Sequence, residues 1–586
     1  MMTVPQALEL AVQHHQAGRL GEAEALYRQI LAVQPGHVDA LQMLGCIAHQ
    51  AGRYDRAVEL IGRAIALYPE YPAAHSNLGE AYRAMGRLEE AVASYRRALQ
   101  IKPDYPVCHY NLGNVLKDQG HLDEAIAEYR CALRLQSNLW EACNNLGNAL
   151  KDQGEIAEAI AAYRRAHELN PGHAEVNSNI VFTLHFLPGQ NGEAIAHEQK
   201  CWNERFGASA SRAARRHDND RNPERRLRIG YVSPDFRKHA VGWNLMPLFE
   251  RHDRGNFEIV CYSGVIRPDE VTAELQKRAQ HWRGTVGVSD EALAEMIRQD
   301  GVDILVDLSL HTNGNRLPVF AWQPAPVQVS FAGYPESTGV ESIKYRISDR
   351  YLEGGTVRGA NASEEQVCLI DSFWCYDPGG VEVKVNALPA KENGRVTFGS
   401  LNNFCKINEP LLKLWARVLA EVRDAHLVFL CGFGQHRQRT CAVLEQEGVA
   451  PERVEFAEPG SRRAYLELYH RLDVVLDPFP YNGHMTSLDA LWMGVPVVSL
   501  AGQTPLARGG LSILTNLGLP ELVAESEEEY VAIAARLASD LPRLAELRQT
   551  LRARMEASVL MDAERFARGI EGAYRAMWRQ WCDSDE

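Results

Sequence analysis

The sequence lacks the features that mark membrane, secreted and metal-cluster proteins. No run of about 18 apolar residues occurs, and residues 1–13 contain no basic region followed by an apolar stretch and a cleavage site. We therefore expect no membrane partner and a cytoplasmic location. The 12 cysteines are scattered without a C-x-x-C pair or a zinc spacing, which favours reduced thiols over disulfides.

Basic residues are too few for a broad nucleic-acid surface. Lysine and arginine number 62 against 76 acidic residues, which gives a net charge of -14. Because such a surface must displace cations from phosphates, we expect no nucleic-acid partner. The 586 residues, of which 46% are hydrophobic, predict about three or four domains with large cores.

A 34-residue period organises the first third of the chain. Glycine, alanine and proline recur at this interval: Gly18, Gly52, Gly86, Gly120 and Gly154; Gly45, Gly79, Gly113 and Gly147; Ala23, Ala57, Ala91, Ala125 and Ala159; Pro35, Pro69, Pro103 and Pro171. The pattern resembles the tetratricopeptide repeat, in which pairs of helices pack through small residues and proline ends the second helix. We predict an all-helical arm over residues 1–186, with the glycines and alanines as packing residues.

Asparagine recurs at the same period, one residue before the Leu-Gly pair that contains the second glycine series, or its equivalent. The four residues are Asn77, Asn111, Asn145 and Asn179. A stacked arm places equivalent residues in a row, and amide groups in a row could bind both N–H and C=O groups of an extended acceptor peptide. Hydrogen bonds to neighbouring helices would explain the same pattern.

Short apolar runs alternate with helical patterns after a connector assigned to residues 187–225, of which 205–226 form a polar, basic stretch. Such alternation predicts parallel sheets flanked by helices. The runs are 227–232, 257–262, 304–308 and 327–331, then 396–398, 426–431, 453–456, 474–476 and 495–500. We predict two Rossmann-like halves, 226–389 and 390–586, divided around Pro389, Asn393 and Gly394.

The segment after the run 474–476 is a candidate diphosphate site. Asp477 ends the expected strand, residues 478–484 form a turn rich in Pro, Asn and Gly, and a helix begins near residue 485. The free N–H groups of residues 485–487 could bind a diphosphate, with His484 at the mouth and Asp489 close to the ribose hydroxyls. An ordinary capped helix with Asp489 as a surface charge fits the same spacing.

One basic side chain follows the first strand of each half. Lys406 follows the run 396–398 and could neutralise a leaving phosphate. His239 follows the run 227–232 and could act as the general base for an attacking hydroxyl. A single lysine after a strand is usually only solvated, and most single histidines on loops are not catalytic.

The two D-x-D patterns of the chain do not suggest a catalytic metal site. They lie at residues 218–220 in the connector and 583–585 in the tail, and neither follows an expected strand. A sugar-transfer enzyme must stabilise the departing diphosphate with a metal or with cationic and N–H groups. We therefore expect departure without a metal, and no cofactor.

Four ordered motifs together resemble the family of protein O-linked N-acetylglucosamine transferases and their plant relative SPINDLY, an O-fucosyltransferase. The motifs occupy residues 230–236, 323–335, 398–406 and 482–492. The resemblance implies a double Rossmann-like fold of the GT-B type and an inverting transfer to Ser or Thr without metal. It assigns His239 to the acceptor side, Lys406 to the donor phosphate and Asp300 to proton removal; the implied donor contacts also include Asn403, Arg462, Tyr465, His484, Met485, Thr486 and Asp489.

Some positions depart from the pattern of the N-acetylglucosamine enzymes. Met485 replaces a usual threonine, Asp303 replaces a histidine on the acceptor side, and the residues around Arg462, Tyr465 and Leu468 differ at the nucleobase pocket. The resemblance favours UDP-N-acetylglucosamine as donor and proteins held by the arm as acceptors. The alternatives are GDP-fucose as donor, a repeat scaffold that senses a nucleotide sugar without catalysis, and an epimerase or small-molecule transferase, which the arm argues against.

Overall fold

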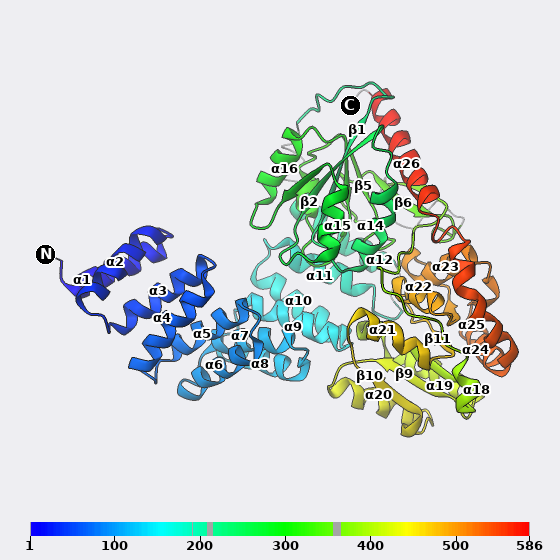
Figure 1. Ribbon diagram of the computed structural model, residues 1–586, viewed down its shortest axis with the longest axis horizontal. Helices are drawn as coiled ribbons and strands as arrows, with labels where there is room; N and C mark the ends of the chain where they lie inside the picture. The colour runs from blue at the N-terminus through cyan, green and yellow to red at the C-terminus, as the bar shows by residue number, and fades with distance from the viewer. Residues whose placement is uncertain (1, 190–191, 208–214, 355–364, 585–586) are drawn as a thin grey trace. The chain divides into compact units, whose positions relative to one another are not determined.

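The computed structural model describes residues 2–189, 192–207, 215–354 and 365–584 and divides into two compact units (Figure 1). The first unit contains residues 1–153 with 168–170. The second contains residues 154–167 and 171–586, and therefore holds both α/β halves. Within the described part, no helix is both long and apolar enough to cross a bilayer.

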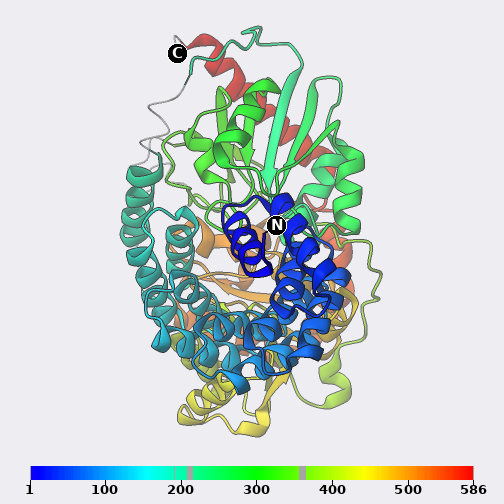
Figure 2. The same cartoon turned by 90° about the vertical axis from the view of Figure 1, so that its left-hand side faces the viewer.

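The first unit consists of antiparallel helix pairs that follow one another along the chain (Figure 2). Its helices are α1 (Val4–Gln16), α2 (Leu20–Val33), α3 (Val38–Gln50), α4 (Tyr54–Leu67), α5 (Pro72–Ala84), α6 (Leu88–Ile101), α7 (Pro106–Asp118), α8 (Leu122–Leu135) and α9 (Trp140–Asp152). Each helix of a pair also packs on the next pair. The predicted helical repeats are confirmed.

The two glycine series have different roles, which corrects the prediction that all of them are packing residues. Gly18, Gly52, Gly86, Gly120 and Gly154 have φ between 71° and 81° and end the first helix of each pair, where glycine is favoured because it has no Cβ. Gly79 and Gly113 are the packing residues, since a Cβ on either would lie 2.7 Å from the ring of Tyr95 or Tyr129.

A substitution pair tests this packing role. Gly113→Ala should lower the free energy of unfolding of the arm by roughly 1–3 kcal/mol, because the added methyl meets the buried Tyr129 ring. Gly62→Ala in α4 is the control, since its Cβ would meet nothing within 4 Å and should raise stability by about 0.5–1 kcal/mol. Urea unfolding followed by far-ultraviolet circular dichroism measures both, and equal effects would contradict the assignment.

The segment predicted as a connector is partly helical. Three helices precede the first sheet in the second unit: α10 (Ile156–Leu169, whose last two residues belong to the first unit), α11 (Ala174–Leu184) and α12 (Gly192–Trp202). Ile195, Gln199 and Trp202 are buried at helical spacing, and α12 packs on α11. The predicted connector 187–225 is therefore helical over residues 192–207, while residues 190–191 and 208–214 lie outside the described part.

The first sheet contains seven parallel strands in the order β3-β2-β1-β4-β5-β6-β7. They are β1 (Leu227–Ser233), β2 (Phe257–Ser263), β3 (His281–Gly284), β4 (Ile304–Asp307), β5 (Val327–Ser330), β6 (Tyr345–Asp349) and β7 (Gln366–Ile370), with helices α14 (Ala240–Arg251), α15 (Glu270–Arg278), α16 (Asp290–Gln299) and α17 (Leu317–Ala321). All four predicted runs are strands. Strands β3, β6 and β7 were not predicted.

The second sheet contains six parallel strands in the order β10-β9-β8-β11-β12-β13. They are β8 (Thr397–Ser400), β9 (His426–Leu430), β10 (Val454–Ala457), β11 (Val474–Leu476), β12 (Val497–Leu500) and β13 (Val523–Ala524), with helices α18 (Pro389–Asn393), α19 (Glu409–Glu421), α20 (Gln435–Gln446), α21 (Arg462–Leu468), α22 (Met485–Trp492), α23 (Gly509–Asn516), α24 (Glu527–Ser539), α25 (Leu541–Glu556) and α26 (Ala563–Asp583). The five predicted runs of this half are strands.

The C-terminal helix returns to the first sheet. α26 packs on α14 and β7, and the Tyr574 hydroxyl donates a hydrogen bond to that of Tyr231 in β1 (3.2 Å). His252, at the end of α14, bonds through Nδ1 to the buried Glu571 carboxylate of α26 (2.8 Å). The half predicted as 390–586 therefore gives its last helix to the other half, a packing that ties the two halves together.

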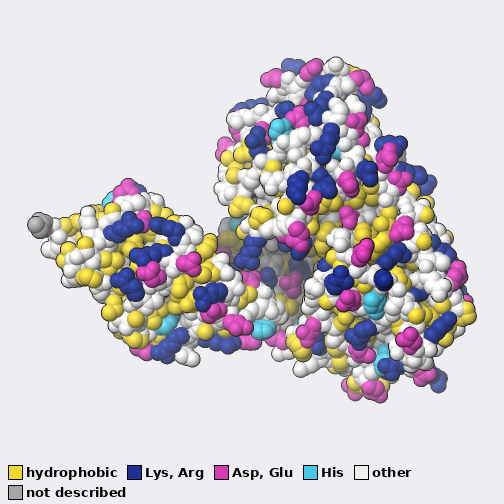
Figure 3. All heavy atoms as spheres, in the orientation of Figure 1, with side chains coloured by type: hydrophobic (Ala, Val, Ile, Leu, Met, Phe, Trp, Pro, Cys, Tyr) yellow, Lys and Arg dark blue, Asp and Glu magenta, His cyan; other side chains and the backbone are white. Residues whose placement is uncertain are grey.

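The surface carries charges of both signs. Lysine and arginine side chains are interspersed with aspartate and glutamate on the face shown in Figure 3. This mixture agrees with the net charge of -14.

Candidate functional site

The strand order places two loops of the second half next to each other. The sheet order reverses between β8 and β11, which pair directly, and ligands of such sheets bind where the loops after these two strands diverge. The loop after β8 carries Lys406 and the loop after β11 carries the turn 478–484. In the first sheet the order reverses between β1 and β4, and His239 follows β1.

Lys406 lies against the predicted turn. Its ammonium donates a hydrogen bond to the carbonyl oxygen of Asn482 (Nζ to O, 2.6 Å) and lies 4.0 Å from the centre of the Tyr481 ring. The Tyr481 ring in turn lies 5.3 Å, centre to centre, from the His484 ring. The structure thus brings Lys406 and His484 together, as the sequence predicted, while their donor role stays a prediction.

A buried carboxylate holds the turn in shape. Asp477 Oδ1 accepts hydrogen bonds from the Gly483 N–H (2.8 Å) and the Ser487 hydroxyl (3.0 Å), and Oδ2 accepts one from the Ser499 hydroxyl (2.6 Å). Burial raises the pKa of Asp477 to about 6, against the opposing effect of these donors and of Lys406. The sequence analysis missed this role, although an aspartate directly at a strand end before a glycine turn is a recognisable signal.

Burial controls the charge of Lys406 and His484. It lowers the pKa of Lys406 to about 8. Burial and the nearby lysine lower the pKa of His484 to about 3, so this imidazole is neutral at physiological pH. His484 Nε2 lies 3.3 Å from the Leu506 carbonyl oxygen, and a carbonyl accepts only from N–H, which assigns the proton to Nε2 and leaves Nδ1 as an acceptor.

The first turn of α22 offers backbone donors. Within the described residues, the N–H groups of Met485 and Thr486 make no hydrogen bond, but that of Ser487 donates to the His484 carbonyl (3.1 Å). The prediction of three free donors at 485–487 is therefore reduced to two. The Thr486 hydroxyl donates to Asn402 Oδ1 (2.7 Å), which joins this helix to the loop after β8.

Asp489 is a buried partner of Arg462, not a surface charge. It is 3% exposed, and its carboxylate accepts two hydrogen bonds from the guanidinium (Nη1 to Oδ2, 2.7 Å) and one from the Tyr376 hydroxyl (2.7 Å). The Arg462 guanidinium also lies 4.8 Å from the ring centre of Trp243, on α14 of the first half, and 5.6 Å from that of Tyr465. Trp243 was not predicted, and a ribose contact of Asp489 stays a prediction.

The two other predicted donor contacts differ in exposure. Asn403 is exposed and precedes the short 3-10 helix that carries Lys406. Met485 is half-buried and packs against the hydrophobic core.

His239 caps α14 at the carboxyl edge of the first sheet. Its side chain is 39% exposed, and Nδ1 accepts a hydrogen bond from the Val241 N–H (3.3 Å) and lies 3.7 Å from Asp235 Oδ2. Burial lowers the pKa of His239 more than Asp235 raises it, and Arg237 adds to the decrease. Because Nδ1 accepts, the neutral ring carries its proton on Nε2 and presents a donor to the exposed side.

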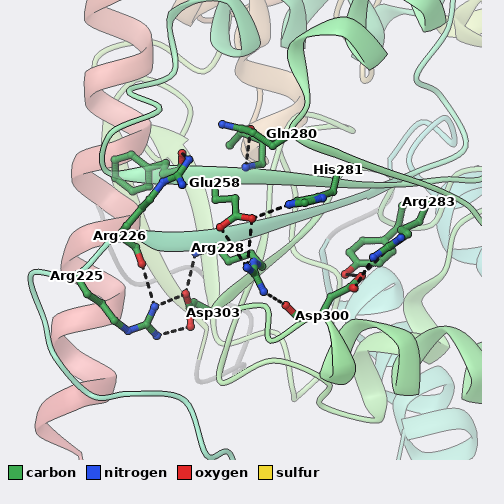
Figure 4. Close-up of polar contacts among 12 residues, drawn as sticks. Arg225, Arg226, Arg228, Glu258, Gln280, His281, Arg283, Asp300 and Asp303 are labelled. Atoms are coloured by element: carbon green, nitrogen blue, oxygen red, sulfur yellow. Dashed lines mark hydrogen bonds and ion pairs between the residues drawn. The ribbon is translucent and has the colours of Figure 1, made fainter.

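Asp300 lies at the opposite, amino-terminal edge of the sheet (Figure 4). It ends α16 just before β4, and its carboxylate accepts hydrogen bonds from Tyr262 (2.8 Å) and from Arg283 (2.8 Å). Burial would raise the pKa of Asp300, but these partners and Arg228 lower it. The structure does not bring Asp300 to His239, because a residue that precedes a parallel strand lies at the edge away from the ligand loops.

Asp303 lies near this same edge (Figure 4), and Asn219 of the first D-x-D pattern bonds to it. Asp303 is 1% exposed, and it accepts hydrogen bonds from the Arg225 guanidinium (2.8 Å), the Asn219 amide (2.7 Å) and the Arg228 N–H (2.8 Å). It therefore anchors the connector to the sheet and does not lie on the acceptor side. In the second D-x-D pattern, Asp585 lies outside the described residues.

The family model that describes Glycosyl transferase family 41 matches residues 185–377 and 384–570, and tetratricopeptide models match segments between residues 8 and 173. This chain belongs to glycosyltransferase family 41. The catalytic model thus covers the two sheets that carry His239 and Lys406.

Known members of family 41 are similar to this chain. The probable UDP-N-acetylglucosamine–peptide N-acetylglucosaminyltransferase SPINDLY of Petunia hybrida is 37% identical over 426 residues, which are 71% of this chain and 46% of the relative. The protein of the same name from Arabidopsis thaliana is 39% identical over 376 residues. The chain thus spans about half the length of the curated relatives it matches.

A solved structure of the family shows the same architecture. A mutant of the O-GlcNAc transferase of Thermobaculum terrenum superposes with a TM-score of 0.80 at 34% identity, and the match covers 87% of this chain and 98% of the other. The predicted combination of a repeat arm and two Rossmann-like halves is confirmed.

The repeated asparagines of this family 41 protein have partners on neighbouring helices at two positions. The Asn77 amide donates to Cys46 Sγ (3.2 Å), and the Asn145 amide donates to the Tyr110 hydroxyl (3.2 Å) and to Asn114 (2.8 Å). Asn111 is half-buried, and Asn179 is buried in the second unit. The bonds of Asn77 and Asn145 agree with the alternative of helix-to-helix contacts, and peptide binding by the row stays a prediction.

The buried Arg462–Asp489 pair can be tested by a double-mutant cycle. Arg462→Met should lower the free energy of unfolding by about 3–5 kcal/mol, because Asp489 is left buried without its cation. The double variant R462M/D489N should lose less than the sum of the two single variants, because neither charge remains. Urea unfolding measures all four proteins, and additive losses would show that the pair is not coupled.

Proposed function

We propose that this chain transfers N-acetylglucosamine from UDP-N-acetylglucosamine to Ser or Thr hydroxyls of proteins, with inversion, without metal or cofactor, in the cytoplasm. The observation that carries the proposal is the position of Lys406 against the turn 478–484 at the switch point of the second sheet. Family membership and the names of the relatives support the donor and the acceptor class. The cytoplasmic location is supported by the twelve cysteines, all described, which form no disulfide.

The leaving diphosphate would be stabilised by groups already in place. The Lys406 ammonium and the N–H groups of Met485 and Thr486 supply positive charge beside the turn 478–484. His484 is neutral there and adds no repulsion to Lys406. Charge of this kind assists departure because it interacts more strongly with the diphosphate after the sugar–oxygen bond breaks.

The acceptor would approach from the first half. Its hydroxyl oxygen forms the new bond to the anomeric carbon from the face opposite the diphosphate, whose bond to that carbon breaks. The exposed Nε2–H of His239 can orient the hydroxyl, while Nδ1 is engaged by the Val241 N–H. The departing diphosphate therefore takes the hydroxyl proton in this proposal, and the arm holds the protein acceptor.

Transfer of radiolabelled sugar tests the proposal. Wild-type protein incubated with UDP-N-acetylglucosamine and a cell lysate should label proteins, and Lys406→Ala should reduce the rate by roughly 10²–10³-fold. Lys413→Ala is the control, because this exposed lysine of α19 pairs with Glu409 and should leave the rate unchanged. Labelling from GDP-fucose but not from the UDP-sugar, or full activity of Lys406→Ala, would refute the proposal.

The depressed pKa of Lys406 predicts a pH dependence of donor binding. Only the ammonium form attracts the diphosphate, and this form is lost as pH rises through about 8. The dissociation constant of UDP should therefore rise above pH 8 by up to about tenfold per pH unit. Lys406→Arg, which keeps its charge, should show a flatter profile in calorimetric titrations between pH 6.5 and 9.5, and identical slopes would contradict the assignment.

A further inference from the structure

Phe186, just after the last helix of the repeat region, contacts the ring that supports the donor lysine. Its ring stacks on that of Tyr481 with a centre-to-centre distance of 4.9 Å and an interplanar angle of 17°. The Lys406 ammonium lies 4.0 Å from the centre of the same Tyr481 ring. Phe186 is 3% exposed, so this stack is sealed from water.

The segment before α10 touches the other flank of Lys406. Gly154 precedes α10, and a Cβ on it would lie 3.3 Å from the Ile407 carbonyl oxygen and 3.4 Å from the Phe404 ring. Glu155 next to it forms an ion pair with Arg439 on α20. Ile407 directly follows Lys406 in the chain, so the start of α10 contacts the lysine loop, while Phe186 after α11 contacts the turn that carries Tyr481.

Polar contacts fix α11 and α12 to the first half. The Ser178 hydroxyl of α11 bonds to His311 Nδ1 (3.0 Å), and His311 Nε2 bonds to the Thr338 carbonyl (2.8 Å). The Gln199 amide of α12 donates to the Ser337 carbonyl (2.7 Å). The carboxylate of Glu336, next to Ser337 in the chain, accepts a hydrogen bond from the Leu506 N–H (3.1 Å). The carbonyl oxygen of Leu506 in turn bonds to His484 Nε2. The segment from α11 to α12 is thus connected to both Lys406 and His484.

We propose that Phe186 is a positioning residue for the donor diphosphate, and that the last repeat helices complete the donor site. This inference rests on the proposed function for the identity of the ligand, a nucleoside diphosphate. The Phe186 ring holds the Tyr481 ring in place, and the Tyr481 ring holds the Lys406 ammonium through its face. Removal of Phe186 frees the tyrosine ring and admits water beside the lysine.

Binding of UDP to the full chain is the first measurement. Phe186→Ala should weaken UDP binding by about tenfold at pH 7.5, because the Tyr481 ring no longer holds the Lys406 ammonium in place. Phe186→Leu keeps an apolar side chain without the stack, and its affinity for UDP should lie between those of wild type and Phe186→Ala. Val181→Ala is the matched control, since Val181 is buried on α11, the helix before Phe186, and has no ring to stack; it should lose stability but not affinity.

Titration of Lys406 without any nucleotide is the second measurement. Reductive methylation with ¹³C-formaldehyde gives each lysine an NMR resonance. The resonance that is missing from Lys406→Arg belongs to Lys406. Its midpoint should be near pH 8 in wild type and Val181→Ala but higher in Phe186→Ala, because water then reaches the ammonium.

The two measurements separate the possible failures. Equal UDP affinity in Phe186→Ala and Val181→Ala, or an unchanged Lys406 midpoint in Phe186→Ala, would overturn the positioning role. If the wild type binds neither UDP nor GDP, the proposed function fails. The Lys406 midpoints of Phe186→Ala and Val181→Ala would still decide whether Phe186 positions the lysine.

Discussion

The buried Asp477 carboxylate at the end of β11 is the constraint on which the site depends. It binds the N–H of Gly483 and the hydroxyls of Ser487 and Ser499, so it fixes the turn and the start of α22 together. The turn then offers the Asn482 carbonyl and the Tyr481 ring to Lys406. A carboxylate without these donors would not remain charged at such burial, and the turn would lose its fixed shape.

Topology explains why residues far apart in sequence meet here. Lys406 and the turn follow β8 and β11, which pair directly where the order of the second sheet reverses, and His239 follows β1 at the equivalent point of the first. The sequence could predict this because strand ends are readable from apolar runs. The same rule, applied to the predicted run 304–308, already places Asp300 at the opposite edge, since it precedes β4; its assignment to proton removal came only from the resemblance.

The missed features are those that depend on long-range pairing. β6 contains Arg346 and Asp349, which look exposed in the sequence, yet Arg346 is buried against Glu353 and Glu365. The pairing of Asp489 with Arg462 was not predicted for the same reason, because Arg462 lies on another helix. β3 and β7 are edge strands with exposed residues. β3 carries no apolar run, whereas residues 367–370 of β7 form one that was not used for a prediction. Local patterns identified elements, but not the partners that allow a charge to be buried.

A crystal structure of the protein with bound UDP tests the central claim most directly. The account predicts diphosphate oxygens within hydrogen-bond distance of Lys406 Nζ and of the N–H groups of Met485 and Thr486, with the turn 478–484 unchanged. A diphosphate bound elsewhere in the second unit, or bound beside the turn 478–484 with the Lys406 ammonium still directed only at Asn482, would contradict it.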